Sequence, residues 1–207
     1  MKNNRSMPFG VWVAIFVAIW VPIIGITHRH YADDMPNIPA PPPAPAGLAA
    51  NIVADSQADP WRVTNFINPF IRVDQGQVTS PEIPGGKALR IAVPEARNNL
   101  YDISVYSLSV RPVRAGDHLD ATVWMRLAPT PGNVRLARVR VLIQESRKPY
   151  PVVADSYVVI GPQWQRYTVQ ANIHKAYAPG ELNLTAHLAS AQQTVDVGQG
   201  QVVVHSD

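Results

Sequence analysis

Residues 118–127 read HLDATVWMRL, and apolar side chains occupy every second position of this stretch. Because successive side chains of a β-strand point to opposite faces, this period of two predicts a strand with one buried face. Residues 182–188, LNLTAHL, show the same alternation and place Asn183, Thr185 and His187 on the polar face. The two stretches therefore predict half-buried strands rather than helices.

The same alternating pattern continues through most of the chain after residue 50. Pro, Gly, Asn or Asp interrupt short alternating segments every eight to twelve residues, and no sustained helical period follows residue 30. The other predicted strands are 62–67, 87–93, 103–111, 134–144, 153–160, 164–170, 193–197 and 201–205. About ten strands with unequal loops and no fixed repeat predict an all-β fold. A two-sheet β-sandwich (jelly roll) suits this pattern better than a propeller or an up-and-down barrel.

The N-terminal region has a different character. Residues 7–27 are 21 consecutive uncharged residues, and a helix of that length spans about 30 Å. After a short tail of residues 1–6, we expect one transmembrane anchor at 7–27. A cleaved secretory signal is the alternative, with Lys2 and Arg5 as its positive region, although no small-residue cleavage site directly follows the apolar run. Positive charge before the span favours a cytoplasmic N-terminus, with the remainder outside.

Residues 28–50 predict a linker. They contain six prolines, and the run from Pro39 to Pro45 favours polyproline II, a semi-rigid spacer. Such a run also suits an aromatic-lined groove on a partner, but a stalk that separates a domain from the membrane is the commoner use. The folded domain is then 51–207.

The composition excludes several classes of protein. The 207-residue chain is 46% hydrophobic, enough for a core, and has no cysteine for a disulfide, zinc thiolate or cysteine nucleophile. Its formal net charge of +3 argues against a dedicated nucleic-acid binder. No nucleophile elbow, zinc-protease motif, phosphate loop or calcium loop is present. We therefore expect a protein that is not an enzyme and needs no cofactor.

The chain contains the motifs VRAGDHLDATVWMRL from Val113, GPQWQRY from Gly161 and LASAQQTVDVG from Leu188. They resemble motifs of carbohydrate-binding modules in the group with families 4, 9, 16 and 22, except that Ala189 replaces the usual glycine. Together they cover most of residues 60–205 in the family's order. The resemblance implies a galactose-binding-like jelly roll and, by extension, glycan binding. The resemblance also implies a structural calcium ion as a candidate, with Asp55 and Asp196 as candidate ligands. The sequence shows no cluster of further ligands to support it.

Two tryptophans in these motifs have a simpler interpretation. Trp124 and Trp164 supply large rings to a domain with little phenylalanine, so we expect them to pack inside the sandwich rather than stack on sugars.

A candidate binding surface lies elsewhere. Sugars are held by flat aromatic faces and by planar polar groups on rigid strands. The candidate ligand-binding residues are Tyr101, Tyr106, Arg138, Arg140, Gln144, Tyr150 and Tyr157. The arginine pair suits an acidic polysaccharide, whereas a solvated sheet face with salt bridges is the simpler alternative.

The same region is rich in positive charge. Residues 101–148 carry eight basic and four acidic side chains, a net charge of +4. An electropositive patch would form if its basic residues shared a face. Those residues are Arg135, Arg138, Arg140, Arg147 and Lys148.

These observations predict a single-pass protein of a bacterial inner membrane with a periplasmic, non-catalytic carbohydrate-binding domain. Its partner would be an envelope polysaccharide or exopolysaccharide during production, export or retention. The main alternative is an assembly module that contacts another envelope protein and binds no glycan. Secretion after signal cleavage is the alternative for location.

Overall fold

The structure is a computed structural model that describes residues 51–53, 61–65, 73–130 and 133–205. In these residues the secondary structure is β, apart from two single turns of 3₁₀ helix, η2 (Pro84–Gly86) and η3 (Leu100–Asp102). The strands are β1 (Arg62–Asn65), β2 (Gln75–Thr79), β3 (Lys87–Val93), β4 (Ile103–Leu108), β5 (His118–Leu127), β6 (Ala137–Glu145), β7 (Val152–Ile160), β8 (Gln165–Asn172), β9 (Leu182–His187) and β10 (Gln193–His205).

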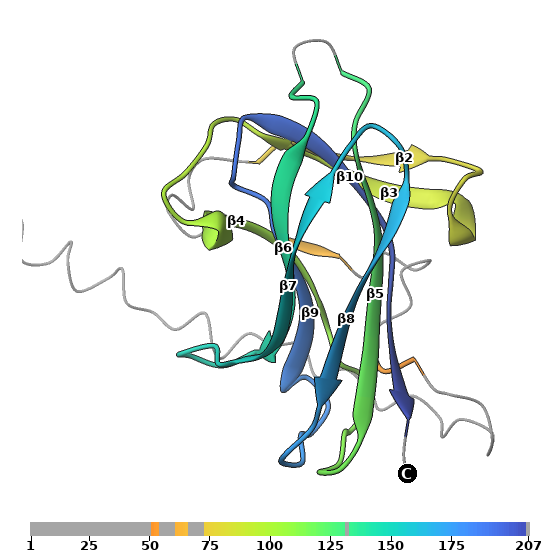
Figure 1. The fold of residues 1–207 in the computed structure, drawn as a ribbon, viewed down its shortest axis with the longest axis vertical. Coiled ribbons are helices and arrows are strands. Elements are labelled where there is room, and N and C mark those ends of the chain that lie inside the picture. The colour runs from red at the N-terminus through yellow and green to blue at the C-terminus, as the bar shows by residue number, and fades with distance from the viewer. Residues whose placement is uncertain (1–50, 54–60, 66–72, 131–132, 206–207) are drawn as a thin grey trace, which may run out of the picture. The chain divides into compact units, whose positions relative to one another are not determined.

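The strands form two five-stranded antiparallel sheets (Figure 1). The first, here the β6 sheet, has the order β1-β4-β9-β6-β7, and the second, the β10 sheet, has the order β2-β3-β10-β5-β8. Every neighbouring pair is antiparallel. The predicted all-β, two-sheet sandwich is confirmed for the described residues.

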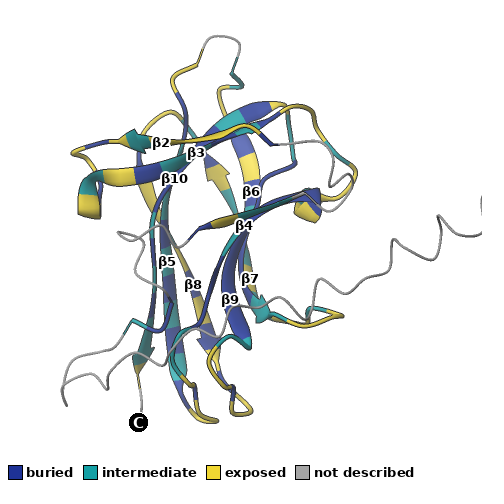
Figure 2. Ribbon diagram, turned by 180° about the vertical axis from the view of Figure 1, so that it is seen from behind, coloured by how far each residue is buried: buried dark blue, intermediate teal, exposed yellow. Residues whose placement is uncertain are grey.

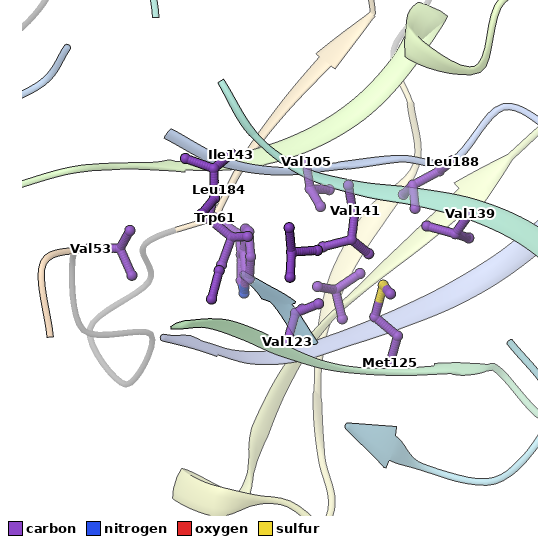
Figure 3. Packing of buried hydrophobic residues seen from close by; sticks show 14 of the residues in the cluster. Val53, Trp61, Val105, Val123, Met125, Val139, Val141, Ile143, Leu184 and Leu188 are labelled. Carbon is purple, nitrogen blue, oxygen red and sulfur yellow. The ribbon is translucent and has the colours of Figure 1, made fainter. Parts of the chain in front are cut away.

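The core lies between the sheets, as the alternation predicts. Val123 and Met125 of β5 face Val139 and Val141 of β6, and all four side chains are at most 1% exposed (Figure 3). Burial of such a side chain contributes about 1.5–3 kcal/mol, so these facing rows hold the sheets together. Figure 2 shows that β9 is buried along its whole length, whereas β7 alternates.

Two predicted strands, 193–197 and 201–205, are one strand in the structure, β10, with a register shift between Val197 and Gly200. Gly198 and Gly200 lie between the two predicted ranges, where they permit a close approach. A Cβ at Gly200 would lie 2.5 Å from Trp61 Cζ2, and Trp61 Nε1 donates a hydrogen bond of 2.8 Å to the Gly198 carbonyl oxygen. Glycine in a strand thus marks a place where a large ring meets the backbone, not an end of the strand.

Strand β2 was missed for a different reason. Its sequence, QGQVT, is almost wholly exposed, and the strand lies at an edge where it pairs with β3 alone. A strand with no buried face has no apolar alternation to detect.

The two tryptophans have the expected structural role at a different place. Trp164 is buried with Ile83 and Ala88, and Trp124 packs against this cluster. Trp124 alternates with the core residues of β5, so the cluster lies on the outer face of the β10 sheet rather than between the sheets. The prediction that these rings are packing residues is therefore confirmed, and they pack on this outer face rather than between the sheets.

The expected membrane anchor, 7–27, and linker, 28–50, lie outside the described residues. Within the described part of the chain, no helix is long and apolar enough to cross a membrane.

Candidate functional site

The candidate site is the outer face of the β6 sheet, which points away from the core. Strand register identifies the side chains that share it, because residues directly opposite each other lie on the same face. We call this surface the β6 outer face. It consists of Arg62 and Thr64 from β1, Ser104, Tyr106 and Leu108 from β4, Asn183, Thr185 and His187 from β9, Arg138, Arg140, Leu142 and Gln144 from β6, and Val152, Asp155, Tyr157 and Val159 from β7.

His187 lies at the centre of this face, opposite Ser104 on one side and Arg140 on the other. It is 6% exposed, and the ring of Tyr101 in η3 meets it edge-on, with 6.1 Å between centroids. Burial and, to a smaller extent, the nearby Arg140 charge lower the pKa of His187 to about 4, against the opposing effect of Asp155. The imidazole is therefore neutral at physiological pH.

Two polar atoms on this face have unused hydrogen-bonding capacity. His187 Nδ1 and Thr64 Oγ1 are buried and have no hydrogen-bond partner among the described residues. Both belong to one row across the sheet, because Thr64 pairs with Ser104 and Ser104 pairs with His187. Most buried polar groups in proteins are satisfied. A hydroxyl group, which both donates and accepts, is suited to complete them.

A second part of the face combines charge with an aromatic ring. Arg140 Nε donates to Asp155 Oδ2 at 2.8 Å, which pairs the two charges. The Tyr157 ring, 49% exposed, has the guanidinium carbon of Arg138 4.1 Å from its centroid and that of Arg140 at 5.5 Å. These distances are within the range of cation–π attraction.

At the other end of the face, the polar side chains form hydrogen bonds within the protein. Thr185 Oγ1 donates to Asn183 Oδ1, and Asn183 Nδ2 donates to Ser146 Oγ at 3.1 Å. Gln144 lies opposite Asn183, four residues along β6 from Arg140 and so about 13 Å away. The unsatisfied and cationic groups are thus concentrated near His187, Arg140 and Arg138.

The structure brings together most of the candidate residues predicted from the sequence. The five that share the β6 outer face are Tyr106, Arg138, Arg140, Gln144 and Tyr157. Tyr101 reaches it from η3 through its contact with His187. Tyr150 does not lie on these strands: it is in the loop between β6 and β7, with φ of 61°. Their role in binding remains a prediction.

Sequence reasoning missed three groups that define the site: His187, Asp155 and Thr64. A signal for His187 existed, because the alternation of 182–188 places it on the polar face of its strand. The pairing of Asp155 with Arg140, and of Thr64 with the row of His187, depends on strand order and register. Local sequence carries neither.

The five basic residues considered as one patch do not form one. Arg135 precedes β6, whereas Arg147 and Lys148 follow it, and a nine-residue strand extends about 30 Å. Arg147 also lies 3.9 Å from Glu181. Of these five residues, Arg138 and Arg140 share the β6 outer face, which also carries Arg62 of β1.

The candidate calcium ligand Asp196 has another role. Its carboxylate accepts hydrogen bonds from Arg90 Nε at 2.7 Å and Arg126 Nε at 2.9 Å, with no exposed surface. Two guanidinium groups occupy the positions that a cation would need. Asp55 lies outside the described residues, and within the described ranges no group of three or more His, Asp or Glu side chains is placed to hold a metal.

Comparison with known structures identifies similar folds. A carbohydrate-binding module of family 4 (CBM4) matches with a TM-score of 0.55 at 15% identity, covering 75% of this chain and 95% of the module. A family 22 (CBM22) xylan-binding domain from Paenibacillus barcinonensis matches with a TM-score of 0.52 at 10% identity, covering 77% of this chain and 97% of that domain. The jelly roll implied by the sequence motifs is confirmed.

The same fold also occurs in an enzyme. A Stig cyclase from Fischerella sp. TAU matches with a TM-score of 0.57 at 11% identity, covering 77% of this chain and 99% of the cyclase. No protein-family model matches this chain, and no curated protein does. At these identities the likeness shows the fold, so function must be argued from the site.

Proposed function

We propose that this protein is a non-catalytic carbohydrate-binding protein and that the β6 outer face binds an oligosaccharide segment of a polysaccharide. One observation carries the proposal: exposed aromatic rings, an arginine pair and buried, unpartnered polar atoms converge on a single sheet face. Similar folds among carbohydrate-binding modules support it.

The arrangement provides both kinds of contact that a sugar needs. The rings of Tyr157 and Tyr101, each about half exposed, offer flat surfaces to the apolar C–H face of a pyranose. Between them, the Arg140–Asp155 pair offers donors and acceptors for hydroxyl groups. These groups project from neighbouring strands of one sheet and from η3, so the surface is organised before a ligand arrives.

The N-terminal sequence supports a location for this activity. A 21-residue uncharged run followed by a proline-rich segment fits an anchor and a stalk that hold the domain on the periplasmic side of a bacterial inner membrane. There the protein would bind an envelope polysaccharide or exopolysaccharide while it is produced, exported or retained.

A second candidate function is an assembly module for another envelope protein. The exposed apolar side chains of Leu136 and Val159, 66% and 57% exposed, favour it, because they flank Arg138 at the β7 edge of the sheet. Apolar residues at a sheet edge are a common feature of protein interfaces. A partner that co-purifies in mild detergent and is lost on Leu136→Ser would favour this function.

The test of glycan binding is affinity electrophoresis of the full chain in non-ionic detergent, through gels that contain xylan, dextran, alginate or polygalacturonate. Tyr157→Ala should reduce the retardation by any glycan that binds, by about tenfold in affinity, because it removes a stacking surface. The matched control is Gln77→Ala, an exposed position on the other sheet. If no polysaccharide retards the wild-type chain, or if both variants behave alike, the glycan-binding proposal fails.

A further inference from the structure

Arg138 and Arg140 lie on the same face of β6, but the structure gives them different surroundings. Arg140 is ion-paired with Asp155 at 2.8 Å. Arg138 is exposed and makes no ion pair with any carboxylate of the described residues. Arg138 thus presents a positive charge that the described residues do not neutralise.

The Tyr157 ring fixes the position of that charge. The guanidinium carbon of Arg138 lies 4.1 Å from the ring centroid, so attraction to the ring holds the group on the surface rather than letting it sweep through solvent. The N–H donors of a guanidinium lie in its own plane and match the paired oxygens of a carboxylate or sulfate. A stacked arginine is therefore a preorganised donor of hydrogen bonds to an anionic group.

The surroundings limit the kind of anion that fits. The Tyr157 ring beside Arg138 is about half exposed, and His187 with its unpartnered Nδ1 lies next to Arg140 in the same row. An anionic group at Arg138 would thus belong to a ligand that also contacts an aromatic ring and carries hydroxyl groups. An acidic sugar has all three features.

We propose that Arg138 binds the anionic substituent of an acidic polysaccharide, a uronate carboxylate or a sulfate ester, while Tyr157 supports the adjoining sugar. The inference rests on the proposed glycan-binding function and names its substrate class. Arg140, held by Asp155, positions Tyr157 and contacts hydroxyl groups instead.

The experiment compares Arg138→Gln with Arg135→Gln in the full chain, in non-ionic detergent. Both changes remove one exposed arginine near the start of β6, so the chain's net charge changes equally. The probes are alginate and polygalacturonate for carboxylate, dextran sulfate for sulfate, and dextran and xylan as neutral polymers, at 0.05 and 0.3 M salt. Thermal unfolding shows whether each variant is folded.

We expect Arg138→Gln to weaken binding to an acidic polymer at least tenfold, and Arg135→Gln to change it less than twofold. Arg138→Lys should recover only part of the loss, because lysine keeps the charge but lacks the planar pair of donors. Retention by alginate or polygalacturonate identifies a carboxylate ligand, and retention by dextran sulfate alone identifies a sulfate.

Two results would overturn the inference. Equal losses for Arg138→Gln and Arg135→Gln, abolished at 0.3 M salt, would show charge attraction without a site. Binding to xylan or dextran with Arg138→Gln unchanged would refute an acidic substrate while leaving glycan binding intact. Absence of binding to every probe would refute the proposed function itself.

Discussion

The outer faces of the two sheets use polar groups in opposite ways. On the β10 sheet, the carboxylate of Asp196 lies between Arg90 and Arg126 and accepts three hydrogen bonds of 2.7–3.0 Å. Arg126 in turn lies under the Trp164 ring, with its guanidinium carbon 4.7 Å from the centroid, and Trp164 Nε1 donates to Ser80 Oγ at 3.0 Å. The polar groups named here are therefore satisfied by contacts within the protein.

The β6 outer face contains similar residue types, arginine, aspartate and aromatic rings, with incomplete pairing. Arg138 has no ion-pair partner among the described residues, and His187 Nδ1 and Thr64 Oγ1 are unpartnered there. Satisfied networks stabilise and rigidify, whereas unsatisfied groups reduce stability and leave capacity for a ligand. The same cation–π motif thus belongs to a satisfied network on the β10 sheet and lies beside unpartnered polar groups on the β6 sheet, where we propose a binding surface.

Replacement of Asp196 tests the structural face and should have the largest effect. Asp196→Asn leaves two guanidinium groups without their buried counter-charge, and such a loss costs about 3–5 kcal/mol. Urea unfolding of the full chain in non-ionic detergent measures it. Asp120→Asn, on the same face of the same sheet but with a side chain 33% exposed, should cost less than about 1 kcal/mol. Comparable losses in the two variants would show that the buried ion pairs of Asp196 contribute no more to stability than the partly exposed contacts of Asp120.

Lowering the pH tests the cost of the unsatisfied histidine. The pKa of His187 in the folded protein is about 4, against an ordinary value of 6.5. Between pH 6.5 and 4, His187 is therefore protonated in the unfolded chain but neutral in the folded chain. Stability contributed by the neutral imidazole is therefore present above pH 6.5 and is lost as the pH falls towards 4. The loss amounts to about 3 kcal/mol.

His187→Gln isolates this effect from the titration of carboxylates over the same range. Urea unfolding at pH 7, 6, 5 and 4 should show a steeper decline for the wild type than for the variant. Parallel curves would mean that His187 titrates normally in the folded protein.

Removal of one hydrogen bond from the structural face should have a smaller effect. Trp164→Phe deletes the Nε1–H that donates to Ser80 and weakens the contact with Arg126, and we expect a loss of about 1 kcal/mol. Glycan affinity should not change, because this ring belongs to the other sheet. A loss of affinity without a loss of stability would place the binding surface on the β10 sheet and reverse the comparison.

The sequence predicts the fold better than the site because the two depend on different information. Period-two alternation marks strands with one buried face, and it identifies β5 and β3 with their observed limits. It does not detect β2, which has no buried face, and it divides β10 in two at the glycines that accommodate Trp61. Both failures are local, and neither alters the sandwich.

The site was predicted in its residue types but not in its connections. Arg138 and Arg140 are neighbours on a strand face in any register, so sequence alone places them together. Their different environments arise because β7 brings Asp155 and Tyr157 beside β6, and β9 brings His187. Pairing between distant strands is a property of the fold, so the distinction between a paired and an unpaired arginine is visible only in the structure.

Removal of either charge of the Arg140–Asp155 pair provides the test with the smallest expected effect, because the two substitutions should move the pKa of His187 in opposite directions. The positive charge of Arg140 lowers the pKa of His187 and the negative charge of Asp155 raises it. Arg140→Gln should therefore raise the His187 pKa above its value near 4, and Asp155→Asn should lower it. Each variant should change the free energy of unfolding by less than about 1 kcal/mol, since the pair is partly solvated. An NMR titration of the imidazole resonances of the full chain, with His187→Gln to assign the signal, measures both shifts. Shifts of the same sign in both variants would show that burial changes at His187 outweigh the charges, and the β6 outer face would then be a packed surface like its counterpart.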